Sequence, residues 1–287
     1  MNTSDSTEQL FSFELFPPKT AQGFDKLKAN VEKLNTLKPA FFSVTYGAGG
    51  STQQRTFETV DWLWEQQIDT APHLSCIGAD RDEILQILER YRDKGLHRVV
   101  ALRGDLPSGI GLGDLGELNH ANQLVALIRE HFGDHFHIEV AAYPEFHPQS
   151  SSPKQDLKHF KNKVEAGANS AITQYFYNAD AYFRFLDDCQ RLQIDIPIVP
   201  GVMPITNSLQ LGRFSDACGA EIPRWIRKRL EGYGEDLESI RSFGTEVVTA
   251  LCERLLSGGA PGLHFYTMNQ AEPTTRIWQA LHANFKF

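Results

Sequence analysis

Residues 11–18 read FSFELFPP, and this stretch decides between two α/β folds. The aromatic run over 11–16 predicts a β-strand. A doubly wound sheet usually opens with a Gly-rich turn directly after its first strand. Here Pro17 and Pro18 follow the strand, and they cannot form such a turn. The stretch therefore favours the other fold built from alternating strands and helices, the closed barrel.

The rest of the chain repeats this strand pattern, with helical spacing in the gaps. Ile84, Ile87, Leu88 and Tyr91 recur at three- and four-residue spacing, after a good N-cap residue at Asp80. Seven more strand candidates follow the first, at 41–47 (FFSVTYG), 70–76 (TAPHLSC), 98–104 (RVVALRG), 137–144 (HIEVAAYP), 170–176 (SAITQYF), 197–204 (PIVPGVMP) and 262–269 (GLHFYTMN).

Eight strand-helix units in about 250 residues are typical of a (β/α)8 TIM barrel. The long gap between the seventh and eighth strands predicts extra helices at 222–230 and 237–256. No Ser- or Pro-rich linker divides the chain. We therefore expect one domain over 11–287, preceded by a flexible tail at 1–10.

Composition and charge exclude several classes of function. The 287 residues include 28 Lys and Arg against 36 Asp and Glu, so the net charge of −8 argues against nucleic acid or an anionic membrane as a partner. The first ten residues carry no apolar signal segment, and no apolar run is long enough to span a bilayer. The four cysteines form no CxxC pair, which is typical of reduced thiols. These features predict a cytoplasmic protein.

Active sites of such barrels lie at the carboxyl ends of the strands. Polar residues stand at most of these ends, although strand ends are in general wetter than strand middles. The candidates are Glu14, Thr45, Tyr46, His73, Arg103, Asp105, Tyr143, Glu145, His147, Gln174, Tyr266 and Asn269. Because so many strand ends carry polar residues, we expect these residues to line one polar opening, the mouth of the barrel.

Other interpretations stay open at this point. Residues 111–116 (GLGDLG) match GxGxxG, but six residues separate them from the preceding strand, so a loop is the better interpretation. Residues 47–51 (GAGGS) predict either an anion-binding nest or a plain loop. His73, Asp105, Glu145 and His147 could together ligate a metal in a hydrolase or lyase. A non-catalytic scaffold is the third alternative.

Eight blocks in order resemble one family, the 5,10-methylenetetrahydrofolate reductases in the bacterial form that has only the catalytic barrel. The resemblance runs from Phe11 through essentially the whole chain. The matching blocks are 13–19 (FELFPPK), 43–48 (SVTYGA), 71–74 (APHL), 101–107 (ALRGDLP), 142–148 (AYPEFHP), 167–169 (GAN), 172–174 (ITQ) and 264–269 (HFYTMN).

The resemblance implies FAD as cofactor and a ping-pong hydride relay. NADH or NADPH, with NADH favoured, would reduce the flavin, which would then reduce 5,10-methylenetetrahydrofolate to 5-methyltetrahydrofolate and so supply methyl groups for methionine synthesis. Glu14 matches the general acid that opens the folate ring. Asp105 matches a carboxylate beside the flavin and the pterin, where it favours a cationic iminium.

The resemblance also implies the binding residues and a homo-oligomer, either a tetramer or a dimer. The flavin contacts would be Thr45, Tyr46, Ala48, His73, Arg103, Gly104, Asp105, His120, Ala121, Tyr143, His147, Asp156, His159 and Lys163. The substrate contacts would be Asp105, Gln174, Gln210, Phe214, Tyr266 and Gln270. Some members carry Arg where this chain has Gln270, and an amide cannot replace that charge. Arg213 and Arg276 stand near in sequence.

Overall fold

The structure is a computed structural model, and it describes residues 9–46, 50–104 and 117–282. All pairs of neighbouring strands are parallel, in the order β7-β6-β5-β4-β3-β2-β1-β9-β8. The strands are β1 Leu10–Leu15, β2 Phe41–Val44, β3 Thr70–Ser75, β4 Arg98–Leu102, β5 His137–Ala142, β6 Ser170–Thr173, β7 Ile198–Val199, β8 Gly201–Val202 and β9 Gly262–Tyr266.

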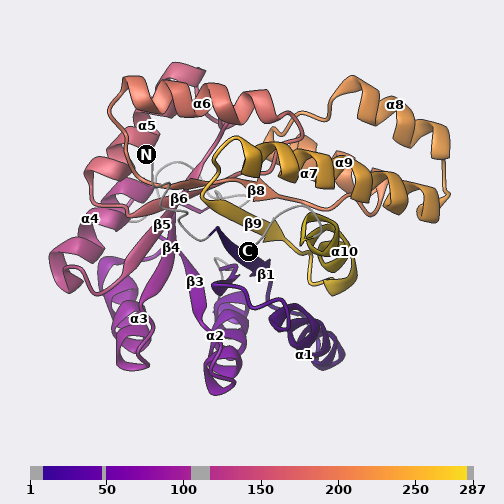
Figure 1. The fold of residues 1–287 in the computed structure, drawn as a ribbon. Coiled ribbons are helices and arrows are strands. Elements are labelled where there is room, and N and C mark those ends of the chain that lie inside the picture. Colours follow the sequence, from indigo (N-terminus) through magenta and orange to yellow (C-terminus); the bar gives the residue numbers. More distant parts are fainter. Residues whose placement is uncertain (1–8, 47–49, 105–116, 283–287) are drawn as a thin grey trace, which may run out of the picture.

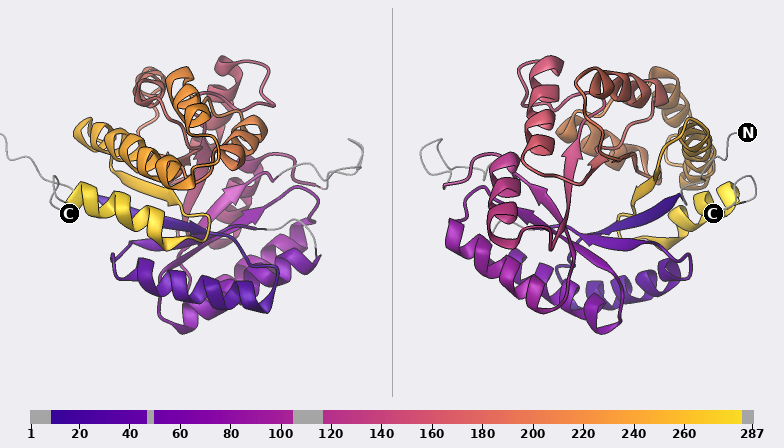
Figure 2. Two further views of the ribbon diagram at one scale, coloured as in Figure 1. Left: turned by 90° about the vertical axis from the view of Figure 1, so that its right-hand side faces the viewer. Right: turned by 60° about the vertical axis from the view of Figure 1, so that its left-hand side comes forward.

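Helices lie outside the strands, as Figure 1 and both views of Figure 2 show. They are α1 Ala21–Asn35, α2 Gly50–Glu65, α3 Arg81–Asp93, α4 Ala121–Phe132, α5 Pro153–Glu165, α6 Ala179–Arg191, α7 Ser208–Cys218, α8 Arg224–Tyr233, α9 Leu237–Ser257 and α10 Ala271–His282. The predicted (β/α)8 barrel with extra helices before its last strand is therefore confirmed. No helix in the described part of the chain is long and apolar enough to cross a membrane.

The predicted seventh strand is split in two at Pro200, which has no N–H to donate to a strand ladder. Its first half, β7, pairs with β6, whereas its second half, β8, pairs with β9. The carbonyl of Pro200 still accepts from the backbone N–H of His264 at 3.0 Å. Because the two halves bond opposite neighbours, nine short strands form the nearly closed ring that eight were expected to form.

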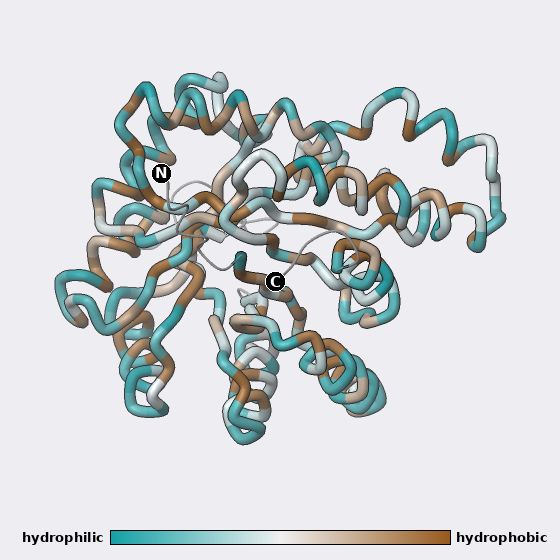
Figure 3. Tube along the Cα trace, in the orientation of Figure 1, coloured by the Kyte–Doolittle hydropathy of each residue, from teal (hydrophilic) through white to brown (hydrophobic). Residues whose placement is uncertain are grey.

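Strand β1 shows how the residues are divided between the two sides of the ring. Phe11, Phe13 and Leu15 belong to the main core, between the strands and the helices. The intervening residues, Ser12 and Glu14, face the barrel interior, because side chains alternate along a strand. Figure 3 shows hydrophobic residues along the strands and on one side of many helices.

Local signals explain several helix ends. The carboxylate of Asp80 accepts from the backbone N–H of Glu83 at 2.7 Å, so it caps α3 as predicted. Gly95, just beyond this helix, has a φ of +78°, which glycine adopts without strain. Helix α7 was not predicted, and its N-cap is Asn207, whose side chain accepts from the backbone N–H of Gln210 at 2.9 Å.

Candidate functional site

The carboxyl ends of the strands lie on one side of the barrel because all the strands run parallel. At this mouth the structure brings together side chains from three different strands around Glu14. The Oε2 atom of Glu14 lies 3.5 Å from Nε2 of His73 and 3.9 Å from Nε2 of His264. The Glu14 side chain is 20% exposed, so it is open to the mouth while its neighbours are buried.

His264 lies beneath Glu14 and was not among the predicted site residues. It is fully buried, with Nδ1 2.7 Å from the hydroxyl of Ser12 and Nε2 3.5 Å from that of Ser43. The pairing of β1 with β9 sets Ser12 opposite His264 and Glu14 opposite Tyr266. Alternation along the predicted strand at 262–269 places His264 on the same face as Tyr266, and this signal could have found it.

His73 presents an unsatisfied polar atom to this site. Its side chain is buried, and its Nε2 atom has no hydrogen-bond partner among the described residues. Burial lowers the pKa of His73 to about 4, although the nearby Glu14 acts in the opposite direction. The imidazole is therefore neutral near pH 7. A buried polar atom without a partner is costly unless a bound group satisfies it.

Tyrosines form the wall between β6 and β9. The hydroxyl of Tyr266 donates to the carbonyl of Thr173 at 2.7 Å, which joins β9 to β6. The hydroxyl of Tyr175 lies 3.0 Å from that of Ser215 on α7. Burial raises the pKa of Tyr266, and the charge of Glu14 raises it further, so this phenol stays protonated.

A hollow opens beside this wall at the ends of β5 and β6. Gln174 lines it, and the side-chain oxygen of Gln174 accepts from the backbone N–H of Tyr175 at 3.0 Å. The other residues that line it are Tyr143, Pro144, Glu145, Phe146, Tyr175, Phe176, Cys218, Gly219 and Ala220. The hollow thus combines aromatic surface with an amide and a carboxyl group, a composition suited to a flat heterocycle.

A hydrogen bond links the segment after helix α7 to the end of β5, at one side of the mouth. The carboxylate of Glu145 accepts from the backbone N–H of Glu221 at 2.8 Å, just after this helix. Burial raises the pKa of Glu145, an effect that the Glu221 N–H opposes. Gln210 and Phe214 lie four residues apart on α7 and so share one face. Phe214 is partly exposed, as a ring that stacks on a ligand must be.

The predicted flavin contacts of β2 and β4 lie at the same end of the barrel. The hydroxyl of Tyr46 accepts from the Gln53 side chain at 2.7 Å. The carbonyl of Thr45 accepts from the hydroxyl of Thr56 at 3.0 Å. Gly104 has a φ of +89°, and a Cβ atom there would lie 1.8 Å from Oγ of Ser75. Only glycine therefore fits beside Ser75.

Arg103 faces the segment that follows β5. Its guanidinium bonds the side chain of Gln149. In that segment the rings of Tyr143 and His147 meet edge to face at 4.7 Å. The backbone N–H of His147 donates to Asp156 at 3.0 Å. These contacts join the predicted residues of β4, β5 and α5 into one side of the mouth.

The remaining predicted flavin contacts belong to α4 and α5. The rings of His120 and His159 stack with their centroids 6.0 Å apart, next to Ala121 at the start of α4. The ammonium group of Lys163 donates to the carbonyl of Ala141. Burial lowers the pKa of Lys163 to about 8, and the nearby Asp156 opposes this shift.

Two of the predicted site residues are not placed by the structure. Asp105 and Ala48 lie outside the described residues, as do 111–116. Gln270 lies at the start of α10, where its backbone N–H donates to the carbonyl of Thr267 at 2.9 Å. The alternative metal site gains no support from the geometry. In the described ranges no three His, Cys, Asp or Glu residues form a group that could hold an ion, and Glu145 is turned toward Glu221.

The chain matches known proteins over nearly its whole length. The family model described as "Methylenetetrahydrofolate reductase" matches residues 1–282. A protein of Salmonella typhimurium named 5,10-methylenetetrahydrofolate reductase is 41% identical over 271 residues, covering 94% of this chain and 90% of that protein. The Escherichia coli protein of the same name is 40% identical with the same coverage. "Methylenetetrahydrofolate reductase (NADH) 1" of Arabidopsis thaliana is 36% identical, and the match covers 93% of this chain and 47% of that protein.

Solved structures agree on the fold. A protein from Clostridium thermocellum, described as binding two copies of 5-methyl-5,6,7,8-tetrahydrofolic acid, superposes with a TM-score of 0.66 at 18% identity. The match covers 96% of this chain and 95% of that one. At this level of identity the likeness shows a shared barrel.

Proposed function

Since the chain belongs to the methylenetetrahydrofolate reductase family, we propose that it reduces 5,10-methylenetetrahydrofolate to 5-methyltetrahydrofolate with NADH or NADPH, through bound FAD. The observation that carries the proposal is the position of Glu14, whose carboxylate stands at the barrel mouth between two buried histidines. NADH is the favoured donor because the Arabidopsis relative is named for it. The solved Clostridium protein, whose description names a methylated tetrahydrofolate, supports the proposed product.

The residues at the mouth fit FAD as a cofactor. Nε2 of the buried His73 has no hydrogen-bond partner among the described residues, and the flavin ring system offers several polar atoms that could bond to it. When bound, FAD supplies hydride transfer between the dinucleotide and the folate. We assign it to the strand-end and helix residues Thr45, Tyr46, Ala48, His73, Arg103, Gly104, Asp105, His120, Ala121, Tyr143, His147, Asp156, His159 and Lys163.

Glu14 is the proposed general acid. The bridging carbon of the substrate joins two nitrogens, and one of these bonds must break before hydride can be accepted. In this scheme Glu14 donates its proton to the leaving nitrogen as that bond breaks, which leaves a cationic iminium on the other nitrogen. Neutral His73 sets no fixed positive charge beside Glu14, so it does not oppose the approach of this cation.

Other side chains would bind and orient the folate. The amide of Gln174 offers a donor and an acceptor together, which suits the edge of a pterin. The ring of Phe214 would stack on the pterin, with Gln210, Tyr266 and Gln270 as further contacts. Asp105 would stabilise the iminium by its negative charge. A single domain over 11–287, assembly into a homo-oligomer and a cytoplasmic location stay predictions.

The function is tested with purified protein, FAD, NADH and methylenetetrahydrofolate. We expect stoichiometric formation of 5-methyltetrahydrofolate, measured by chromatography with mass detection, and none without FAD. A parallel reaction with NADPH measures the donor preference. Protein that holds FAD but forms no methylated product with either donor would contradict the proposal.

A further inference from the structure

The segment between β9 and α10 reaches back to the strand that carries Glu14. The backbone pairing of β1 with β9 ends where Glu14 lies opposite Tyr266. Beyond this pair, side chains join the two segments. The hydroxyl of Thr267 donates to the carbonyl of Glu14 at 2.6 Å. The amide of Asn269 bonds the backbone of Phe16, so the chain on both sides of the proposed general acid is fixed from β9.

Asn269 makes this contact with both ends of its amide. Its side-chain oxygen accepts from the backbone N–H of Phe16 at 3.0 Å, and its side-chain nitrogen donates to the carbonyl of Phe16 at 2.8 Å. Pro17 follows Phe16 and restricts it to an extended conformation. The amide of Asn269 therefore pairs with Phe16 in the way that a residue of a neighbouring strand would.

The backbone that presents these side chains is strained. Met268 and Asn269 have φ values of +52° and +55°, in the left-handed region that residues other than glycine seldom adopt. Hydrogen bonds hold this conformation. The backbone N–H of Asn269 donates to the hydroxyl of Thr267 at 3.2 Å, and that of Gln270 donates to the carbonyl of Thr267 at 2.9 Å. Strain of this kind persists where the surrounding contacts fix it, and it is concentrated at functional sites.

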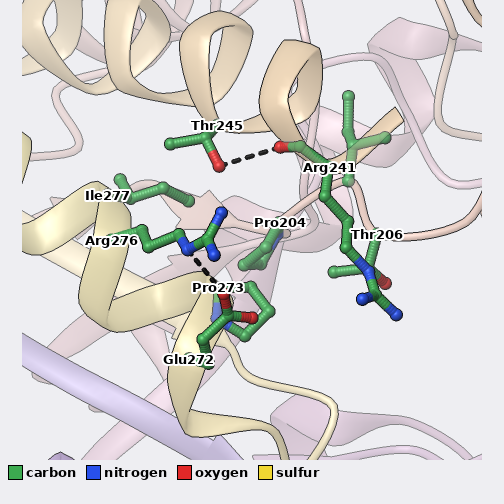
Figure 4. A pocket seen from close by; sticks show the side chains of 9 residues that line it. Pro204, Thr206, Arg241, Thr245, Glu272, Pro273, Arg276 and Ile277 are labelled. Carbon is green, nitrogen blue, oxygen red and sulfur yellow. Dashed lines mark hydrogen bonds and ion pairs between the residues drawn. The ribbon is translucent and has the colours of Figure 1, made fainter. Parts of the chain in front are cut away.

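The strained segment is supported by the elements around it. Thr267 is almost completely buried. The first residue of α10, Ala271, donates its backbone N–H to the side chain of Asn30 on α1 at 3.0 Å. Figure 4 shows the first turns of α10 beside α9, where Pro204 and Ile277 line a separate hollow. Because both ends of the segment are anchored, it can hold the end of β1 in place.

We propose that Thr267 and Asn269 are positioning residues for the proton transfer from Glu14. The inference rests on the proposed function. The carboxyl group of Glu14 must stand within hydrogen-bond reach of the leaving nitrogen, and the end of β1 sets its place. A displacement of about 1 Å can lower a rate by about 10²-fold. Reduction of the flavin by NADH needs no proton from Glu14, so it does not depend on this positioning.

Two substitutions remove the contacts with little other change. Asn269→Gly keeps the left-handed backbone but loses the amide, and Thr267→Val keeps the shape of the side chain but loses the hydroxyl. Each should lower kcat for folate reduction by about 10- to 100-fold, with KM for the folate and the rate of flavin reduction within about twofold of the parent. Thr267→Ser keeps the hydroxyl and should regain most of the rate. Asn35→Gly, at the exposed end of α1, is the control.

A double variant separates positioning from a purely structural role. If Asn269 acts through Glu14, Asn269→Gly should cost no more than about twofold in the Glu14→Gln background, since no acid is left to position. Stopped-flow absorbance measures both half-reactions, and chromatography measures the slow formation of product. A full further loss in the double variant, or equal slowing of flavin reduction, would overturn the inference.

The outcomes also separate this inference from the function. Parent-like folate reduction in either single variant would overturn the inference and leave the proposed function intact. A parent protein that oxidises NADH through FAD but reduces no folate would contradict the proposed function, and the inference with it.

Discussion

His73 and Glu14 meet at the barrel mouth with Nε2 and Oε2 3.5 Å apart, and the imidazole nitrogen has no hydrogen-bond partner among the described residues. Burial keeps this histidine neutral until the pH falls to about 4. The pair is therefore a neutral imidazole beside a carboxyl group near pH 7. Such a pair can take up a polar ligand without first breaking an ion pair.

The buried His73 makes the stability of the fold depend on pH. His73 titrates near 6.5 in the unfolded chain and near 4 in the folded one. As the pH falls from 6.5 to 4, the unfolded chain therefore binds a proton that the folded chain does not, and stability is lost. We expect this histidine to contribute a loss of about 2–3 kcal/mol over that range, measured by urea unfolding without FAD. His73→Gln should remove most of it, whereas the exposed control His131→Gln should not. An unchanged slope in His73→Gln would refute the assignment.

Glu14→Gln separates the two halves of the proposed reaction. The amide keeps the size of the side chain but cannot donate a proton as an acid. Reduction of the flavin by NADH should continue at a similar rate, and reduction of the folate should fall by about 10²- to 10⁴-fold. Stopped-flow absorbance measures both steps, with Glu32→Gln on α1 as a surface control. Parent-like folate reduction in Glu14→Gln would show that another group supplies the proton.

Glu145 should act on folate binding through α7. Its carboxylate accepts a hydrogen bond from the backbone N–H of Glu221, just after α7. Without this bond the end of α7, the helix that carries Phe214, is less firmly positioned. Glu145→Ala should raise KM for the folate about fivefold, as expected for a contact of about 1 kcal/mol, and leave flavin reduction unchanged. Glu145→Gln keeps an accepting oxygen and should stay close to the parent. Equal effects of both variants on the two half-reactions would contradict this role.

Gly104 should tolerate no side chain. A Cβ atom there would meet Oγ of Ser75 at 1.8 Å, and its φ of +89° is strained for other residues. Gly104→Ala should therefore lower the free energy of unfolding by about 2–4 kcal/mol. Adding Ser75→Gly removes the closest clash but leaves the strain and a 3.0 Å contact with Cγ2 of Ile77, so the double variant should regain part of the loss. Gly212→Ala is the control, since no described residue lies within 4 Å of its added Cβ atom. A double variant no more stable than Gly104→Ala would show that strain alone sets the cost.

Much of the fold could be predicted because its signals are local. Asp80 and Gly95 bound α3 through a cap and a left-handed turn, and both effects depend on a few neighbouring residues. The split at Pro200 follows from a missing N–H, yet the expected strand at 197–204 included it. Helix α7 was not predicted from the sequence. Only Leu211 and Ser215 are buried on it, so the helix has no apolar stripe that a periodicity search could detect.

The site was predicted from the resemblance more than from local patterns. Glu14, Gln174 and Tyr266 follow from strand ends, which all face one mouth. The contact of Glu14 with His264 depends on the register between β1 and β9. These two residues are 250 positions apart in the sequence, so the contact forms only on folding. The hydrogen bond from the backbone N–H of Glu221 to the carboxylate of Glu145 likewise joins residues that are distant in the sequence and meet only on folding.

The most direct test of the account is an anaerobic absorption spectrum of the FAD-loaded protein. NADH is added first, and methylenetetrahydrofolate follows. We expect the flavin band to bleach with NADH and to return with the folate, because both substrates would exchange hydride with the same cofactor. A band that bleaches but does not return, or a protein that binds no FAD, would contradict the central claim that this barrel is a flavin-dependent folate reductase.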